Sequence, residues 1–227
     1  GLASTSGGME EIMNALPLPL QAFFGSVSDA GTSIGTYKMI HLYLAIALSL
    51  HAILLGADIF SKEEHDRTYE FLYIKGVTRV KILLFKIVAG MALLLVLDVV
   101  CLIGIMVSGA FVGYSMQVME LLPYLSALFV AQLLFFSIAL LLSFLLPDNH
   151  KTGMVGCCIV FVMLMLSMYV KMGGVIGFLE EWSIFHYLDA SYIASHQSEI
   201  LPFLLLIVLA AIGFVLSEVF HQRRDLL

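Results

Sequence analysis

The densest group of chemically capable side chains lies in a charged run between two apolar stretches, at residues 61–81. Its first half contains carboxylates and an imidazole, residue types that bind metals or move protons: Glu63, Glu64, His65 and Asp66. No H-x-x-x-H or H-E-x-x-H spacing accompanies them, so the pattern does not predict a metal centre. Bases follow the acids, and the run is typical of a solvated loop that presents both charges to water.

A second candidate is Asp98, which lies near the middle of an apolar run at residues 82–112. An ionisable side chain inside a membrane is costly and is a functional hypothesis in its own right. Two interpretations stay open: Asp98 lines a substrate path or binds a cation, or it is a protonated or hydrogen-bonded acid at a helix–helix contact.

Histidines on the preceding apolar run pose the same question. His51 and Asp58 are seven residues apart and therefore share a helical face, with His41 further towards the start of the run. A proton relay or metal pair is one interpretation, and hydrogen bonding at a helix interface is the simpler one.

Five long apolar runs must hold these residues in place. The chain is 61% hydrophobic and only 12% charged, whereas soluble domains carry about 25% charged residues. A helix needs roughly 20 residues to cross a bilayer, and continuous apolar runs favour helices over strands of a barrel. The sequence therefore predicts an all-α, polytopic membrane protein with five transmembrane helices, at about 38–60, 82–112, 121–146, 153–170 and 200–220.

The cations indicate the orientation. Cytoplasmic loops attract Lys and Arg, and one orientation places nine of the eleven on that side: Lys62, Arg67, Lys75, Arg79, Lys81, Lys86, Lys151, Arg223 and Arg224. The C-terminus is then cytoplasmic, and an external leader (1–37, with the amphipathic stretch 9–16) and an external segment (171–199) lie opposite. Five spans place residue 1 outside, so we expect a further helix upstream. No basic cluster of the nucleic-acid-binding type is present.

Within the charged run, Thr68–Ile74 could form a short helix, capped by Asp66 or Thr68 and ended by Gly76. Its exposed Phe71 and Leu72 invite docking against another protein. The alternative is a helix that lies along the lipid headgroups.

The order of residues in this run resembles that of ABC type-2 transporter permeases. In that family the second helix is followed by a pattern of roughly E-x-E-x-G-T-x-E-x-L-L, then P-V-S-R, then a Lys on the next helix. The matching positions are Thr68, Glu70, Leu72, Val77, Thr78, Arg79 and Lys86. Arg67 replaces the usual Gly and Gly76 the usual Pro. The leader, the aromatic segment EEWSIFHYLDASYI and the ending FHQRRDL resemble further parts of the family pattern.

The resemblance implies a six-helix permease that works as a homo- or heterodimer with two copies of an ATP-binding subunit. It implies that this chain is not itself an enzyme, and that ATP and magnesium are bound by the partner. No Walker A sequence occurs in the 227 residues. Carried over, the ATPase-coupling residues are Glu63, Glu64, Asp66, Thr68, Glu70, Phe71, Leu72, Val77 and Arg79. The expected role is export of a drug, antimicrobial peptide or lipid across a bacterial plasma membrane.

Two other classes compete with the exporter hypothesis. A self-sufficient ion-coupled carrier or channel could use Asp98 and the histidines. An intramembrane protease could use paired glutamates, but Glu63-Glu64 and Glu180-Glu181 both fall outside the apolar runs, where water is not excluded.

Overall fold

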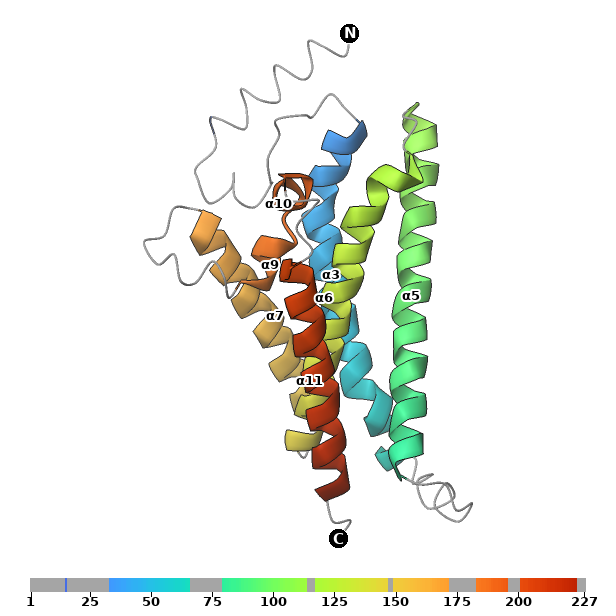
Figure 1. Ribbon diagram of the computed structural model, residues 1–227, viewed down its shortest axis with the longest axis vertical. Coiled ribbons are helices and arrows are strands. Elements are labelled where there is room, and N and C mark those ends of the chain that lie inside the picture. Colours follow the sequence, from blue (N-terminus) through green and yellow to red (C-terminus); the bar gives the residue numbers. More distant parts are fainter. Residues whose placement is uncertain are drawn as a thin grey trace. The chain divides into compact units, whose positions relative to one another are not determined.

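The computed structural model describes Ala15 and residues 33–65, 79–113, 117–146, 149–171, 183–195 and 201–223. These residues form helices, and no strand occurs among them (Figure 1). The helices are α3 (Ser33–His65), α5 (Arg79–Val112), α6 (Val118–Leu145), α7 (Asn149–Lys171), α9 (Ile184–Tyr187), α10 (Ala190–Ser195) and α11 (Leu201–Arg223). The predicted all-α class is therefore confirmed.

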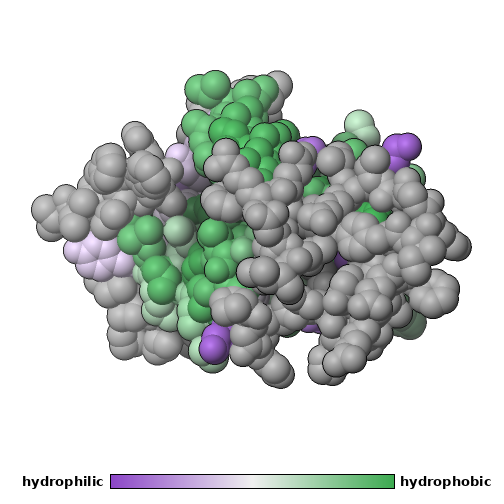
Figure 2. All heavy atoms as spheres, turned by 90° about the horizontal axis from the view of Figure 1, so that it is seen from below, coloured by the Kyte–Doolittle hydropathy of each residue, from purple (hydrophilic) through white to green (hydrophobic). Residues whose placement is uncertain are grey.

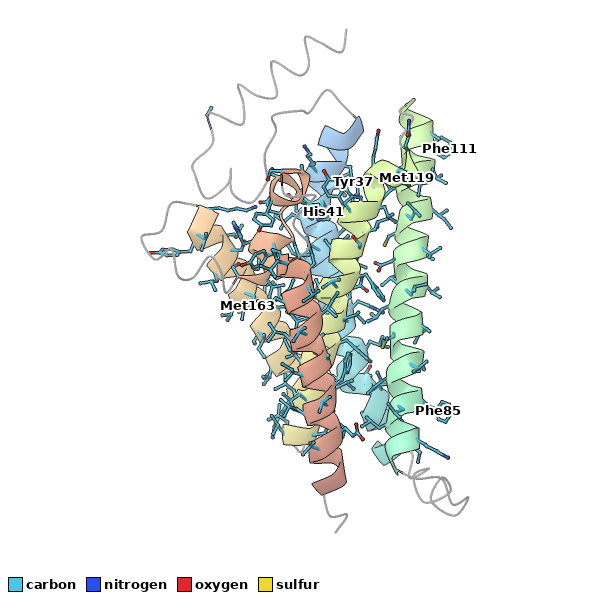
Figure 3. The ribbon with its side chains drawn as sticks, viewed as in Figure 1. Tyr37, His41, Phe85, Phe111, Met119 and Met163 are labelled. Carbon is cyan, nitrogen blue, oxygen red and sulfur yellow. The ribbon has the colours of Figure 1, made fainter. Side chains whose placement is uncertain are left out.

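Five of the described helices are long and apolar enough to cross a membrane. Their apolar parts are Ile40–Ile59, Lys81–Phe111, Val118–Leu145, Lys151–Lys171 and Leu201–Val219. On the face seen in Figure 2, the described residues are coloured mostly hydrophobic. Large apolar side chains are exposed along these helices, such as Phe85 and Phe111, which project outward from α5 in Figure 3. Such exposure is unfavourable in water but suits contact with lipid chains, so the protein is a multi-pass membrane protein.

The helices extend further than hydropathy alone predicts. α3 continues five residues beyond Phe60 to His65, and α5 begins at Arg79, three residues before the predicted start. Lys and Glu are good helix formers, so a helix does not end where its apolar residues do. α7 also begins earlier than predicted, at Asn149 rather than at residue 153.

The turn between α5 and α6 is set by two local signals. Gly113 ends α5 with a φ of 83°, a left-handed conformation that glycine adopts without steric cost. Glu120 lies in the first turn of α6, where the helix dipole favours an acid. Pro123 lies inside α6, in its second turn.

The chain divides into two compact units. The first unit contains residues 1–47, 99–128 and 161–200, and the second contains residues 48–98, 129–160 and 201–227. The core of the second unit is centred on α6, whose Phe135, Phe136 and Leu140 are fully buried. In the first unit the fully buried side chains include Tyr37, Tyr124 and Phe185.

Candidate functional site

The residues predicted to couple to an ATPase lie at and between the ends of α3 and α5. Glu63 and Glu64 belong to the last turn of α3, and Arg79 is the first residue of α5. The other predicted coupling residues and the expected short helix at Thr68–Ile74 lie outside the described residues: Asp66, Thr68, Glu70, Phe71, Leu72 and Val77. The two described helices therefore lead directly into the predicted coupling segment, and the assignment of the individual residues stays a prediction.

In the second unit, both of these helices contact the same residue of α6. Gly56 of α3 lies so near α6 that an added Cβ would be 2.9 Å from the Phe136 carbonyl oxygen and 3.2 Å from Phe136 Cδ2. Gly90 of α5 lies against the ring, where an added Cβ would be 2.9 Å from Phe136 Cε2. Small residues of this kind allow membrane helices to approach closely and pack by van der Waals contact.

α11 contacts the same part of α6, through Gly213 and Phe214. The ring centroids of Phe136 and Phe214 are 5.9 Å apart, and the planes of the two rings are tilted by 59°. An added Cβ at Gly213 would lie 2.7 Å from Ser137 Oγ, so this approach is also close. Phe136 is therefore a common contact for α3, α5 and α11. We refer to Phe136, Gly56 and Gly90 together as the Phe136 contact.

The predicted residue Asp98 is buried, and it has a hydrogen-bond partner that sequence reasoning did not identify. The Gln132 Nε2 of α6 donates to Asp98 Oδ1 at 2.6 Å. Asp98 is 9% exposed and Gln132 is fully buried. Asp98 thus lies at a contact between α5 and α6 within the second unit.

Asp98 belongs to a narrow buried line along α5. The buried residues of this helix in the second unit recur every three or four positions: Leu83, Ile87, Gly90, Leu94 and Asp98. Their neighbours Leu95, Val96 and Val99 are 45–56% exposed. Since this spacing matches one helical face, the part of α5 in the second unit buries one face, on which Gly90 and Asp98 contact α6.

The first unit contains a buried aromatic cluster around His41. Tyr37 Oη lies 3.1 Å from His41 Nδ1, one helical turn apart on α3 (Figure 3). The ring centroid of Tyr124 in α6 lies 5.4 Å from the ring centroid of Tyr37 and 5.5 Å from that of His41. The backbone of Leu188 faces the His41 ring, yet Nε2 has no hydrogen bond among the described residues. We call the side chains of Tyr37, His41 and Tyr124 the His41 cluster.

The short helices of the first unit are held by an ion pair. Asp189 accepts a hydrogen bond from the Ser191 N–H at 2.8 Å, which caps α10, and pairs with Lys171 at the end of α7. Burial raises the pKa of Asp189, but the Lys171 ammonium, this N–H group and His186 together lower it below its ordinary value. The carboxylate is therefore stabilised in its charged form.

The other candidate residues stay separate from these sites. His51 and Asp58 are both exposed on α3 rather than packed between described helices. In the described part of the chain, no group of three or more His, Cys, Asp or Glu residues could hold a metal ion. Cys101, Cys157 and Cys158 lie within apolar helices and form no disulfide with one another.

A signal for the pairing of Asp98 was present in the sequence. Asp98 is the single acid in its apolar run, and Gln132 is the single amide in the next one. Buried polar groups need partners, so lone polar residues on consecutive membrane helices are natural candidates for a pair. The Phe136 contact had no such signal, because glycines and phenylalanines are frequent throughout the chain.

Comparison with known protein families matches residues 7–226 to the family described as ABC-2 family transporter protein. Searches of curated proteins and of solved structures found no match. The family match covers nearly the whole chain, and the five long apolar helices agree with a membrane component of a transporter. The chain belongs to the ABC-2 family of transporters, as a membrane permease rather than an ATPase.

Proposed function

We propose that this permease exports a hydrophobic or amphipathic substrate, and that a separate ATP-binding subunit drives it through the segment between α3 and α5. In this proposal two ATPase subunits bind ATP with magnesium and move the coupling segment at residues 61–81, which includes the last turn of α3 and the first residues of α5. Two permease chains, identical or different, form the path for a drug, an antimicrobial peptide or a lipid. The membrane is a bacterial plasma membrane, and the C-terminus is cytoplasmic because most cations lie on that side.

The observation that supports coupling best is the Phe136 contact. α3 and α5 are the two helices that border the coupling segment, and each places a glycine against Phe136. A force applied to the segment would therefore reach α6 through two close contacts rather than through flexible side chains. Packed interiors transmit displacement because they hold few voids. Movement of α3 and α5 about Phe136 is the step that we propose for changing substrate access.

The test is to purify the chain from its native membrane in mild detergent and to measure vanadate-sensitive ATP hydrolysis in the eluate. We expect a Walker-type ATPase in stoichiometric amount. It should be lost when residues 66–78 are replaced by a neutral Gly/Ser linker of equal length. The matched control is the same kind of replacement at residues 172–180, which the proposed topology places on the opposite side of the membrane.

Either outcome is informative. Retention of the ATPase by the 66–78 variant would remove this segment as the coupling element. A wild-type chain that purifies alone in several detergents would contradict the ATP-driven exporter and favour an ion-coupled carrier.

A further inference from the structure

Two buried oxygen atoms in the second unit lack hydrogen-bond donors. The single hydrogen bond between Gln132 and Asp98 uses one oxygen of the carboxyl group and one amide hydrogen. Asp98 Oδ2 and Gln132 Oε1 have no partner among the described residues, although both atoms are buried. Leaving a buried acceptor unpaired costs about 1–3 kcal/mol, so two such atoms on one bonded pair require an explanation.

Both unpaired atoms are acceptors, so the missing group must be a donor. No charged side chain in the described residues acts on the Asp98 carboxyl group, whose surroundings are determined by burial and by Gln132. An ionised carboxylate at this depth would have one hydrogen bond and no counter-charge. Buried charges are rarely tolerated without pairing, and the residues that precede Asp98 on α5 in the second unit are aliphatic: Leu94, Leu95 and Leu97.

Four kinds of donor or cation can be compared. A sodium or magnesium ion needs several more oxygen ligands than these two atoms provide. A water molecule or a substrate ammonium group needs room beside the carboxyl group, and each of the two unpaired atoms exposes less than 1 Å². A proton needs no volume. It also removes the negative charge and turns one of the two unpaired acceptors into a donor.

We propose that Asp98 binds a proton and that the neutral acid forms a two-point pair with Gln132. The Gln132 N–H donates to Asp98 Oδ1, as observed, and the added proton on Oδ2 lets this O–H donate to Gln132 Oε1. One proton thus satisfies both unpaired oxygens and joins α5 to α6 by two hydrogen bonds. The site is a proton-binding site in the membrane-spanning part of the protein, and it is distinct from the coupling segment.

The pair has a consequence for transport that rests on the proposed function. If ATP-driven movement of α5 separates Asp98 from Gln132, the acid loses its acceptor and meets a different environment, in which it can ionise. Proton release and rebinding would then accompany each cycle. The resting proton itself does not depend on any ATPase, so it can be tested on the isolated chain.

Infrared spectroscopy of the purified chain in an ester-free detergent tests the proposal, because a protonated carboxyl group absorbs apart from carboxylates and amides. At about pH 8, exposed carboxyl groups are ionised. We expect a protonated-carboxyl band in the wild-type chain that shifts in deuterated water and is absent from Asp98→Asn. The exposed Asp58→Asn is the matched control and should keep the band.

A second variant tests the partner and does not rely on the folding of the first. Gln132→Leu removes the acceptor, so the band should remain but move towards the position of a carboxyl group without a hydrogen bond. A wild-type chain without a protonated-carboxyl band at this pH would overturn the proposal and favour bound water or an ammonium group. A band that Gln132→Leu leaves unmoved would overturn the two-point pair.

Discussion

Gly90 of α5 lies against the ring of Phe136 of α6 with no room for a side chain between the two helices. The approach is closest at the ring atom Cζ, and an added Cβ would also be 2.9 Å from Cε2 and 3.1 Å from Cε1. Real Cβ atoms are essentially never found nearer than 3.0 Å to a neighbour. The distance between α5 and α6 is therefore fixed by the absence of a side chain at one residue.

A larger residue at position 90 should destabilise the permease. Overpacking of a close contact costs about 1–3 kcal/mol, so Gly90→Leu should lower the temperature of thermal unfolding in detergent. The matched control is Gly104→Leu on the same helix, because an added Cβ there would meet no described atom within 4 Å. The double variant Gly90→Leu/Phe136→Leu should regain part of the loss. If the Gly90→Leu and Gly104→Leu variants unfolded at the same temperature, the close contact between Gly90 and Phe136 would be contradicted.

Charge reversal in the coupling segment should separate ATP hydrolysis from transport. Glu70→Arg and Arg79→Glu exchange charges that the proposal places against the ATPase, and electrostatic complementarity governs such docking. We expect loss of ATP-driven export with normal membrane assembly, measured by substrate efflux from vesicles and by size-exclusion elution. Lys151→Glu is the matched control, since Lys151 is an exposed cation of α7 that the proposed topology places on the same side of the membrane but outside the coupling segment. Normal export by both test variants would remove these residues from the coupling element.

The His41 cluster should show strong coupling between its two hydrogen-bonded residues. Tyr37→Phe removes the hydroxyl group that pairs with His41 Nδ1. His41 Nδ1 would then lose its hydrogen-bond partner, at a cost of about 1–3 kcal/mol. The double variant Tyr37→Phe/His41→Phe removes both polar groups and should be more stable than Tyr37→Phe alone. Tyr43→Phe is the control, because Tyr43 is 40% exposed on the same helix. Additive effects in a thermal-unfolding cycle would contradict this pairing.

The ion pair of Asp189 predicts an acid-dependent stability of α9 and α10. The pKa of Asp189 is lower in the folded protein than its ordinary value of 3.8, so its contribution is fully present above that pH. It is lost as the pH falls through the lower, folded value. Hydrogen exchange of α10 should therefore be faster in Asp189→Asn than in wild type at neutral pH, and the difference should shrink below pH 3.8.

The control for this prediction is Glu120→Gln, which changes an exposed carboxylate of the same unit. It should leave the exchange of α10 unchanged at every pH. A difference between wild type and Asp189→Asn that persists undiminished in strong acid would show that the carboxylate charge is not the stabilising group.

Hydropathy was sufficient to predict the helical class and the five membrane-spanning helices, because lipid imposes one length and one composition on every span. It placed the ends of α3 and α5 less well, since charged residues such as Glu63 and Arg79 continue a helix after it leaves the apolar layer. The partner of Asp98 was not predicted. The distance along the chain between Asp98 and Gln132 is 34 residues, and only the antiparallel packing of α5 on α6 brings them together.

The Phe136 contact illustrates a stricter limit of prediction from sequence. Gly56, Gly90 and Phe136 have ordinary residue types for a membrane helix, and nothing in their spacing marks them as neighbours. Their importance comes from the rotation of each helix about its axis, which is determined by all the contacts at once. The coupling segment is the opposite case: its assignment comes from residue order, and its structure lies outside the described residues.

The pairing of Asp98 with Gln132 also has a consequence for biosynthesis. Asp98 is made 34 residues before its partner, so α5 enters the membrane while the acid is still unpaired. An Asp at the centre of a membrane helix costs about 3 kcal/mol during insertion, which the 31-residue apolar part of α5 can offset. Part of that cost is recovered when α6 arrives and Gln132 donates a hydrogen bond to the acid. The nascent chain therefore gains free energy by closing the α5–α6 hairpin before later helices are inserted, which gives assembly a defined first step.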